Sequence, residues 1–369
     1  MRAAGLYVHI PFCHVKCRFC DFAAYPGLLK EIPRYLKALE LEMKTQRGRE
    51  VDTLFIGGGT PTVLEAAQLR DLMTALRSHF LLEDSLEASV ECNPESTTAE
   101  KLEAMKQSGV NRLSFGLQAV QDAHLRALGR LHDFAQFEKV FRQARSIGYP
   151  NLNIDLMYGL PGQTLADWEE TIGRVLELSP EHISAYALSV EEFTAFGRSG
   201  VDTDGDNQAE MYETIADRLE AAGYHHYEIS NFARPGLECR HNLKYWRNEP
   251  CLGIGVSAAG YEPPFRRTNA DRVAAYLEAV ESGRSPAVET TALTEPSLVG
   301  EDLMLALRLK EGLTPTARMR ELYGGVLDRY ERLGFLSMES GRVRPTRRGW
   351  LLSNQIFQEL LEPLEVPQC

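Results

Sequence analysis

The chain has 369 residues and is 44% hydrophobic, which suits a large soluble protein with one large domain and a smaller one. Its formal net charge of -12 at pH 7 argues against general nucleic-acid binding, because a phosphate polymer would be repelled. Charged residues interrupt every apolar stretch well before about 18 residues, so no transmembrane helix is predicted.

Three cysteines follow the first predicted strand, a short apolar segment at residues 6–10. Cys13, Cys17 and Cys20 have the spacing C-x3-C-x2-C. Thiolates are soft ligands that suit iron–sulfur clusters, and a cubane 4Fe-4S cluster needs one protein ligand for each iron. The spacing therefore predicts a cluster in which three irons have protein ligands and the fourth iron is open to another ligand.

Two other interpretations of these cysteines are a disulfide with one spare thiol and a zinc site. The chain carries seven cysteines, an odd number, and no signal peptide is evident before them. Both observations indicate a reducing cytosol, where disulfides are uncommon. A zinc site would need a fourth ligand, which His9 or His14 would supply, and this alternative stays open on spacing alone.

Short apolar runs alternate with longer amphipathic stretches along the chain, the pattern of βα units around a parallel sheet. The predicted strands cover residues 6–10, 53–56, 87–91, 112–117, 152–157 and 183–189. The predicted helices cover residues 33–44, 66–79, 99–108, 134–147 and 165–178. The fold class is therefore α/β, a partial TIM-like (β/α)6 barrel over about residues 1–232, with its chemistry at the C-terminal ends of the strands.

Polar or glycine-rich residues follow the predicted strands, as expected at an active face. These segments are Phe12-Cys13, Gly57-Gly58-Gly59-Thr60-Pro61, Glu91-Cys92-Asn93-Pro94, Gln118, and Asp155 with residues 159–162 beyond it. The glycine run lets the backbone approach a ligand closely. An ordinary tight turn explains the run equally well when it is considered alone.

The C-terminal part changes character after Pro296. Residues 297–310, 316–323 and 326–333 are predicted helices, followed by strands at 335–338 and 342–345 around a turn at 340–341, and a last helix from Gly349. This order resembles a winged-helix module, and the predicted domains are residues 1–292 and 293–369. We expect the module to cover the barrel mouth or to meet a partner, because an acidic protein is a poor DNA binder.

Other residues are predicted to be structural. Cys92, Cys239, Cys251 and Cys369 lack ligand spacing and are expected to be buried. His225 and His226 lie in a segment typical of a strand. The only basic patch, Arg342, Arg344, Arg347 and Arg348, is interpreted as a solvated face.

The cysteine loop resembles the signature of the radical S-adenosylmethionine (SAM) superfamily, and the glycine run resembles the motif that holds the methionyl amino group there. A more specific resemblance covers nearly the entire chain. It rests on Tyr7-x-His9-Ile-Pro-Phe-Cys13, Gly57-Gly-Gly-Thr-Pro-Thr62, Phe115-Gly-Leu-Gln118, residues 155–162 and His241-Asn242-Leu-Lys-Tyr245-Trp246. These motifs are similar to the HemN-like group of oxygen-independent coproporphyrinogen III oxidases and, within it, to the HemW branch of haem chaperones.

Two departures separate the chain from the decarboxylating members of that group. Those enzymes have a further cysteine two residues past the third cluster ligand, where this chain has Phe22. They also have a long arm before the cluster strand, whereas six residues precede Tyr7 here. Coproporphyrinogen dehydrogenase activity is therefore not expected, and the His-Asn-x-x-Tyr-Trp motif favours the chaperone.

The resemblance implies a role for individual residues. Cys13, Cys17 and Cys20 would hold the 4Fe-4S cluster, and no catalytic residue is assigned beyond the cofactor sites. SAM would contact Tyr7, Gly58 and Glu91, whose carboxylate accepts hydrogen bonds from the ribose. The residues that match a second SAM site are Phe19, Gly59, Thr60, Gln118, Arg130 and Asp155.

The late motif would bind haem. His241 is the expected iron ligand, Asn242 would orient it, and Tyr245 and Trp246 would stack on the macrocycle. The alternative is that His241 packs at a junction between a loop and a strand. A Gly-x-Gly segment at residues 253–258 lacks the setting of a dinucleotide site and is interpreted as a strand or turn beside the SAM site.

The sequence thus predicts a cytoplasmic protein that binds a 4Fe-4S cluster, one or two SAM molecules and haem. It would deliver haem to acceptor proteins of respiration and would draw electrons for its cluster from a cellular reductant. The alternative is a radical SAM enzyme that acts on a tetrapyrrole, either an oxidase or a methyl or adenosyl transferase. The acceptor, a homodimeric state and membrane docking through an acceptor are left open.

Overall fold

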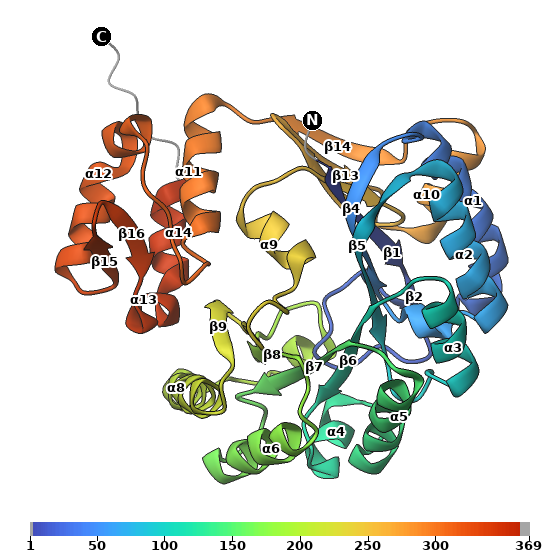
Figure 1. Ribbon diagram of the computed structural model, residues 1–369, viewed down its shortest axis with the longest axis horizontal. Coiled ribbons are helices and arrows are strands. Elements are labelled where there is room, and N and C mark those ends of the chain that lie inside the picture. The colour runs from blue at the N-terminus through green and yellow to red at the C-terminus, as the bar shows by residue number, and fades with distance from the viewer. Residues whose placement is uncertain (1–2, 362–369) are drawn as a thin grey trace.

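The computed structural model describes residues 3–361. Its centre is a twelve-stranded mixed sheet that curls into an open barrel, with strand order β14-β13-β12-β11-β1-β4-β5-β6-β7-β8-β10-β9. Helices cover the outer face of this sheet, and a small C-terminal domain lies beside it (Figure 1). Within residues 3–361 no helix is long and apolar enough to cross a membrane.

Six parallel strands with helical crossovers form the barrel wall, as the sequence predicts. The strands are β1 (Ala4–Ile10), β4 (Glu50–Gly58), β5 (Leu81–Cys92), β6 (Arg112–Gln118), β7 (Asn151–Tyr158) and β8 (His182–Ala187). The helices are α1 (Ile32–Thr45), α2 (Ala66–His79), α3 (Ala99–Gln107), α4 (Asp122–Leu128), α5 (Phe134–Ile147), α6 (Leu165–Glu177), α7 (Ala195–Arg198) and α8 (Gly205–Ala221). Short elements in the first two loops are β2 (Phe12–Cys13), β3 (Tyr25–Pro26), η1 (Leu29–Glu31) and η2 (Pro61–Val63).

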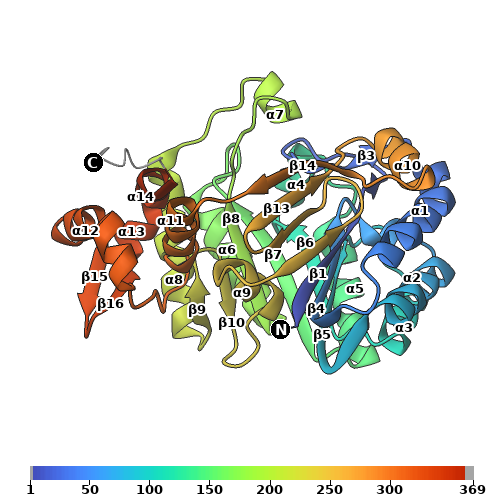
Figure 2. The ribbon, with the colours of Figure 1, turned by 90° about the horizontal axis from the view of Figure 1, so that it is seen from above.

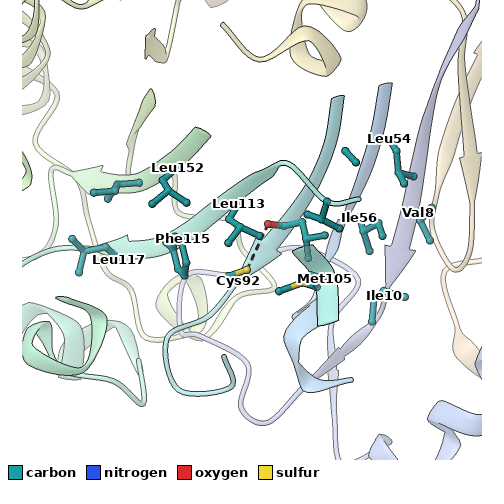
Figure 3. Close-up of a cluster of buried hydrophobic side chains, with 14 of the residues drawn as sticks. Val8, Ile10, Leu54, Ile56, Cys92, Met105, Leu113, Phe115, Leu117 and Leu152 are labelled. Atoms are coloured by element: carbon teal, nitrogen blue, oxygen red, sulfur yellow. Dashed lines mark hydrogen bonds between the residues drawn. The ribbon is translucent and has the colours of Figure 1, made fainter. Parts of the chain in front are cut away.

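The main core lies between the barrel wall and its helices. Parallel strands are buried on both faces, and apolar side chains such as Leu6, Leu54 and Leu113 are fully buried there. Figure 3 shows side chains from β1, β4, β5 and β6 packed with Met105 of α3. Each buried leucine contributes roughly 1.5–3 kcal/mol to folding. Cys92 belongs to this core, which confirms that it is a buried cysteine.

The sheet extends beyond both ends of the predicted barrel. On one side β11 (Cys251–Ile254) pairs in parallel with β1, followed by the antiparallel strands β12 (Ala259–Glu262), β13 (Phe265–Asn269) and β14 (Ala287–Ala292). The helix α10 (Val273–Glu281) packs on α1. On the other side lie β9 (His225–Glu228), which confirms the strand predicted there, and β10 (Asn231–Ala233). The helix α9 (Arg240–Trp246) connects the two sides.

The C-terminal domain has its own core, which includes Leu303, Leu327 and Leu360. Its elements are α11 (Glu295–Ala306), α12 (Ala317–Arg332), β15 (Leu336–Glu339), β16 (Arg342–Pro345), α13 (Arg347–Leu351) and α14 (Ser353–Leu361). The prediction of two helices over 316–333 is wrong, because α12 runs through Gly324 and Gly325. Each glycine costs the helix about 1 kcal/mol, less than the gain from burying its neighbours Tyr323 and Leu327.

Arg347 fixes the C-terminal domain to the barrel. Its guanidinium pairs with Glu213, Asp217 and Glu220 of α8. Two backbone hydrogen bonds join the same parts of the chain, from Ile229 to Arg308 and from Lys310 to Tyr227. The interpretation of the basic patch as a solvated face is therefore wrong for Arg347, because acidic residues of the barrel neutralise it.

A buried carboxylate ties the extra strands to the barrel. Glu42 of α1 accepts hydrogen bonds from the Gly255 backbone at 2.8 Å, from Asn269 at 2.7 Å and from the Tyr276 hydroxyl at 2.6 Å. These three donors come from the turn after β11, from β13 and from α10. One side chain of α1 thus joins three elements that lie more than 200 positions further along the sequence.

We expect Glu42→Ala to lower the free energy of unfolding by roughly 2–5 kcal/mol, because it leaves several buried donors without a partner. Urea denaturation of the full chain measures this loss. Glu40→Ala on the exposed face of the same helix is the control and should change the free energy by only about 0.5 kcal/mol. Equal stability of the two variants would contradict the assignment.

Candidate functional site

The C-terminal ends of the barrel strands surround a cavity of ≈ 340 Å³. All three cysteines of the first loop line it. So do all residues that the resemblance assigns to SAM except Tyr7, namely Phe19, Gly58, Gly59, Thr60, Glu91, Gln118, Arg130 and Asp155. The structure therefore gathers at one place a set of residues that the sequence spreads over more than 140 positions.

Tyr7 does not line the cavity but contacts His9, which packs against the glycine run of the cavity wall. Its hydroxyl lies 3.0 Å from Nδ1 of His9, and its ring stacks on Phe55. The His9 imidazole in turn lies under Gly58, where a Cβ atom would come within 2.5 Å of the ring. Tyr7 thus contributes to the layer of side chains on which the glycine run rests.

The cysteine loop is held by backbone contacts. The Arg18 N–H donates to the Leu128 carbonyl at 2.9 Å, and the Arg18 carbonyl accepts from Phe196 at 2.9 Å. Cys13 is buried, whereas Cys17 and Cys20 are half-buried, and all three are free thiols. Burial raises the pKa of Cys13, and it raises the pKa of Cys20 to about 11. Because iron binds the thiolate, cluster assembly has to displace these protons.

The predicted cluster and the zinc alternative make different demands on the side chains around the three cysteines. Within residues 3–361 no three His, Cys, Asp or Glu side chains converge closely enough to hold one metal ion. His9, one of the two candidate zinc ligands, has its ring nitrogens occupied by Tyr7 and by the Ala23 carbonyl. A 4Fe-4S cluster makes a different demand, because each thiolate binds its own iron.

The glycine run packs against the strand that precedes the cysteines. A Cβ atom on Gly59 would lie 2.7 Å from the Phe12 carbonyl oxygen and 2.9 Å from that of Ile10. The Gly59 N–H donates to the same Ile10 carbonyl at 2.9 Å. Gly58 has φ +109°, a conformation that side chains rarely adopt. The run is therefore required for close packing as well as for access of a ligand to its backbone.

Two buried carboxyl groups face the cavity. Glu91 accepts a hydrogen bond from the Gly58 N–H at 3.0 Å, and Asp155 accepts from Ser114 and from Asn153. Burial raises the pKa of both groups, and burial together with the charge of Asp155 raises the pKa of Glu91 to about 8.

Two further features point to a ligand in this cavity. The Nε atom of Arg130 is buried without a partner in the described structure, and Gln118 has a strained φ of +75°.

Several residues of the cavity wall were not assigned from the sequence. They are Val15, Lys16, Asn93, Ser114, Gly116, Met157, Tyr186 and Glu191, among others. Asn93 follows the last residue of β5 and Tyr186 lies near the end of β8, so their positions at strand ends could have identified them from the sequence.

Gly253 and Ala258, predicted to border the SAM site, do not line this cavity. They line a larger one of ≈ 700 Å³ between α1 and β11–β14, which contains none of the clustered cysteines.

The predicted haem motif lies at the opposite end of the barrel. His241 of α9 is 1% exposed, and its Nδ1 lies 3.0 Å from the Thr53 hydroxyl near the start of β4. Its Nε2 lies 3.1 Å from the Tyr245 hydroxyl, and its ring stacks on Phe55. Burial, reinforced by the charges of Lys244 and Arg112, lowers the pKa of His241 to about 3, so the ring is neutral.

The other residues of the motif surround this histidine. Glu87 of β5 accepts hydrogen bonds at 3.0 Å from the backbone N–H groups of Arg240 and His241, at the start of α9. Asn242 is half-buried, Tyr245 is 37% exposed, and Trp246 stacks under Arg308 of the C-terminal domain. The ring nitrogens of His241 thus have protein partners in this conformation, and its role as a haem ligand stays a prediction.

Two of the other cysteines are buried, and the C-terminal domain lies away from the cavity. Cys239 and Cys251 are buried as predicted, whereas Cys369 lies outside the described residues. The C-terminal domain does not cover the barrel mouth, because no described residue beyond Glu191 lines the cavity with the cysteines. Of the two expectations for this domain, contact with a partner is the one that stays open.

An open parallel barrel with a three-cysteine loop and a glycine run at its C-terminal edge defines a radical SAM protein. Residues 7–175 match the Radical SAM superfamily, and residues 293–352 match the HemN C-terminal domain. A radical SAM domain implies a 4Fe-4S cluster and SAM. The fold is similar to that of coproporphyrinogen III oxidase (HemN) from Escherichia coli, with a TM-score of 0.86 and 26% identity over 98% of this chain and 90% of that chain.

Relatives identify the branch of the superfamily. The chain is 39% identical to the heme chaperone HemW of Bacillus subtilis, over 97% of this chain and 99% of that protein. It is 36% identical to the heme chaperone HemW of Mycobacterium tuberculosis, over 97% of this chain and 94% of that protein. The chain therefore belongs to the HemW family of heme chaperones.

We expect SAM to bind the cluster-loaded protein more tightly as pH rises toward about 8, and affinity to level off above that value. The pKa of Glu91 is raised, so below pH 8 this group is mostly protonated and accepts hydrogen bonds from ribose hydroxyls less well. Each pH unit below the pKa then lowers affinity up to about tenfold. Isothermal titration calorimetry between pH 6 and 9 measures the dependence.

Two variants check the assignment to Glu91. Glu91→Gln should bind SAM more weakly and with little pH dependence, because an amide does not titrate. Asp155→Asn should move the transition to lower pH, because the charge of Asp155 raises the pKa of Glu91. A pH dependence that is unchanged in Glu91→Gln would assign it to another group.

Proposed function

We propose that this protein binds haem and transfers it to acceptor proteins, with a 4Fe-4S cluster on Cys13, Cys17 and Cys20. The observation that carries the proposal is the match to heme chaperones over 97% of the chain. The cavity at the strand ends supports it, because the predicted cluster and SAM residues meet there. The cluster and SAM, when bound, supply one-electron cleavage of a sulfonium C–S bond.

The cavity residues have distinct tasks in this proposal. The three cysteines hold the cluster, and the backbone of Gly58 and the carboxylate of Glu91 bind SAM beside it. Phe19, Gly59, Thr60, Gln118, Arg130 and Asp155 form the remaining wall, and they are the residues that would contact a second SAM. The buried Nε of Arg130 offers a donor to a carboxylate.

A second candidate function is a radical SAM reaction on a tetrapyrrole. The observation that favours it is the similarity to the coproporphyrinogen III oxidase structure over 98% of the chain. The position of Phe22 argues against it, because this side chain lines the cavity and is 62% exposed where the decarboxylating enzymes are expected to carry a cysteine.

The proposed setting is the cytoplasm, with a cellular reductant for the cluster and respiratory haem proteins as acceptors. The net charge of -12 disfavours direct attraction to anionic lipid or nucleic acid. A membrane-bound acceptor would therefore have to recruit the protein by specific contact. A homodimer is compatible with this scheme, and size-exclusion chromatography with light scattering would reveal it.

The two functions are distinguished by one anaerobic experiment. The reconstituted protein is offered haem and coproporphyrinogen III in separate reactions, with SAM and a reductant. We expect haem to pass to an apo respiratory haem protein, seen in the absorbance of the acceptor, and no decarboxylated product. Decarboxylation with stoichiometric 5′-deoxyadenosine would overturn the chaperone proposal in favour of the enzyme.

Cysteine variants link this result to the cluster. Cys17→Ala should abolish the iron and sulfide content of the reconstituted protein, because only two thiolates of the loop remain. Cys239→Ala is the matched control, since it removes a buried cysteine outside the cavity. An unaltered cluster in Cys17→Ala would refute the ligand assignment.

We also propose that α9 contributes to haem binding once it leaves the end of the barrel. His241 becomes a ligand only if its contacts with Thr53 and Tyr245 are broken, which leaves buried polar groups unpaired. We expect His241→Ala to lower haem affinity and transfer at least tenfold while cluster content stays at the parent level. Absorbance titration with haem measures the affinity.

The control for this variant addresses packing. Thr53→Val removes a polar contact of the same ring without removing the imidazole. It should therefore not lower haem affinity, and it should raise the affinity to the extent that this contact holds His241 inside the barrel. Thermal unfolding of both variants reports their common loss of packing. Equal haem affinity in His241→Ala and the parent protein would show that the histidine only closes the barrel.

A further inference from the structure

Two side chains direct polar hydrogens toward sulfur atoms of the cysteine loop. The Thr60 hydroxyl oxygen lies 3.3 Å from Sγ of Cys13, and this contact is buried. The Nη1 atom of Arg130 lies 3.5 Å from Sγ of Cys17. Two of the three sulfurs of the loop thus have a side-chain donor next to them.

Asn93 connects the two side-chain donors. Its Oδ1 accepts from Nη2 of Arg130 at 2.8 Å, and its Nδ2 donates to the Thr60 oxygen at 2.9 Å. Arginine has only donors, so the oxygen of the Asn93 amide must face Arg130 and its nitrogen must face Thr60. Once Cys13 binds iron as a thiolate it has no proton to donate, so the Thr60 hydroxyl, whose oxygen accepts from Asn93, donates its own proton to Cys13.

The backbone of Asn93 is fixed as well. Its N–H donates to the Thr62 hydroxyl at 3.2 Å, and its carbonyl accepts from Thr97 at 2.8 Å. Nη2 of Arg130 also donates to the Gly116 carbonyl at 2.7 Å, which holds the guanidinium in place. The chain from Arg130 through Asn93 to Thr60 is therefore set before any ligand arrives.

We propose that Asn93 is a positioning residue that holds hydrogen-bond donors on Cys13 and Cys17 and thereby raises the reduction potential of the cluster. A donor to a thiolate stabilises the negative charge that reduction adds, so its loss favours the oxidised cluster. The inference rests on the proposed cluster ligation by Cys13, Cys17 and Cys20. It gives Thr60 and Arg130 a task toward sulfur that is separate from contact with SAM.

Redox titration of the reconstituted full chain, followed by electron paramagnetic resonance without SAM, tests the proposal. We expect Thr60→Val and Asn93→Ala to keep the parent iron and sulfide content and to shift the midpoint potential to more negative values. The shift in Asn93→Ala should equal or exceed that in Thr60→Val, because Asn93 orients both donors. The double variant should shift no further than Asn93→Ala alone.

Two further variants test whether the change in midpoint potential comes from the loss of the contact with sulfur. Thr60→Ser keeps the hydroxyl and should restore the parent potential. Thr53→Val makes the same substitution at the other end of the barrel and should leave the potential unchanged. If Asn93→Ala fails to hold a cluster, the comparison of Thr60→Val with Thr60→Ser decides whether the hydroxyl that Asn93 orients sets the midpoint potential.

The outcomes separate this inference from the proposed function. If Thr60→Val and Asn93→Ala keep full cluster content and have the midpoint potential of the parent protein, the inference is overturned. The haem chaperone proposal then remains intact. A parent protein that binds no cluster after anaerobic loading with iron and sulfide overturns both the cluster assignment and the inference. Negative shifts that Thr60→Ser reverses support the inference.

Discussion

The parallel pairing of β1 with β4 is the constraint on which the site depends. The register places Ile10 opposite Gly58, so the loop with Cys13 begins beside the glycine run. The Gly59 N–H extends the pairing to the Ile10 carbonyl, and the missing Cβ of Gly59 lets two segments of backbone touch. A slip of one residue would reverse the faces of the strand and separate the cysteines from Thr60 and Glu91.

The two ends of the barrel are built on opposite principles. At the C-terminal ends of the strands, the glycine run and the ends of β5 to β8 surround a cavity with buried carboxyl groups. At the other end α9 fills the barrel, where its buried histidine has partners for its ring nitrogens. In the position that α9 has in the structure, His241 packs inside the barrel and its ring nitrogens are not free to bind iron. Binding of haem iron by His241 would therefore require a second position of α9.

Local patterns were sufficient to predict much of this fold. The alternation of apolar runs placed all six barrel strands, and α2 and α5 have the predicted bounds, because amphipathic spacing is local. Features that depend on distant partners were missed. The pairing of β11 with β1, the ion pairs of Arg347 and the burial of His241 all join residues more than 100 positions apart. The orientation of Asn93 follows from Arg130, which no local pattern reveals.

The position of the C-terminal domain beside the barrel limits the effect that mutations in this domain have on the cavity. Figure 2 shows this domain beside α8, with which Arg347 forms ion pairs. No described residue after Glu191 enters the wall of the cysteine cavity. Mutations in residues 293–361 therefore affect the chemistry at the strand ends only indirectly, through the stability of the sheet. Surface residues of that domain can therefore change while the wall of the cysteine cavity keeps its residues.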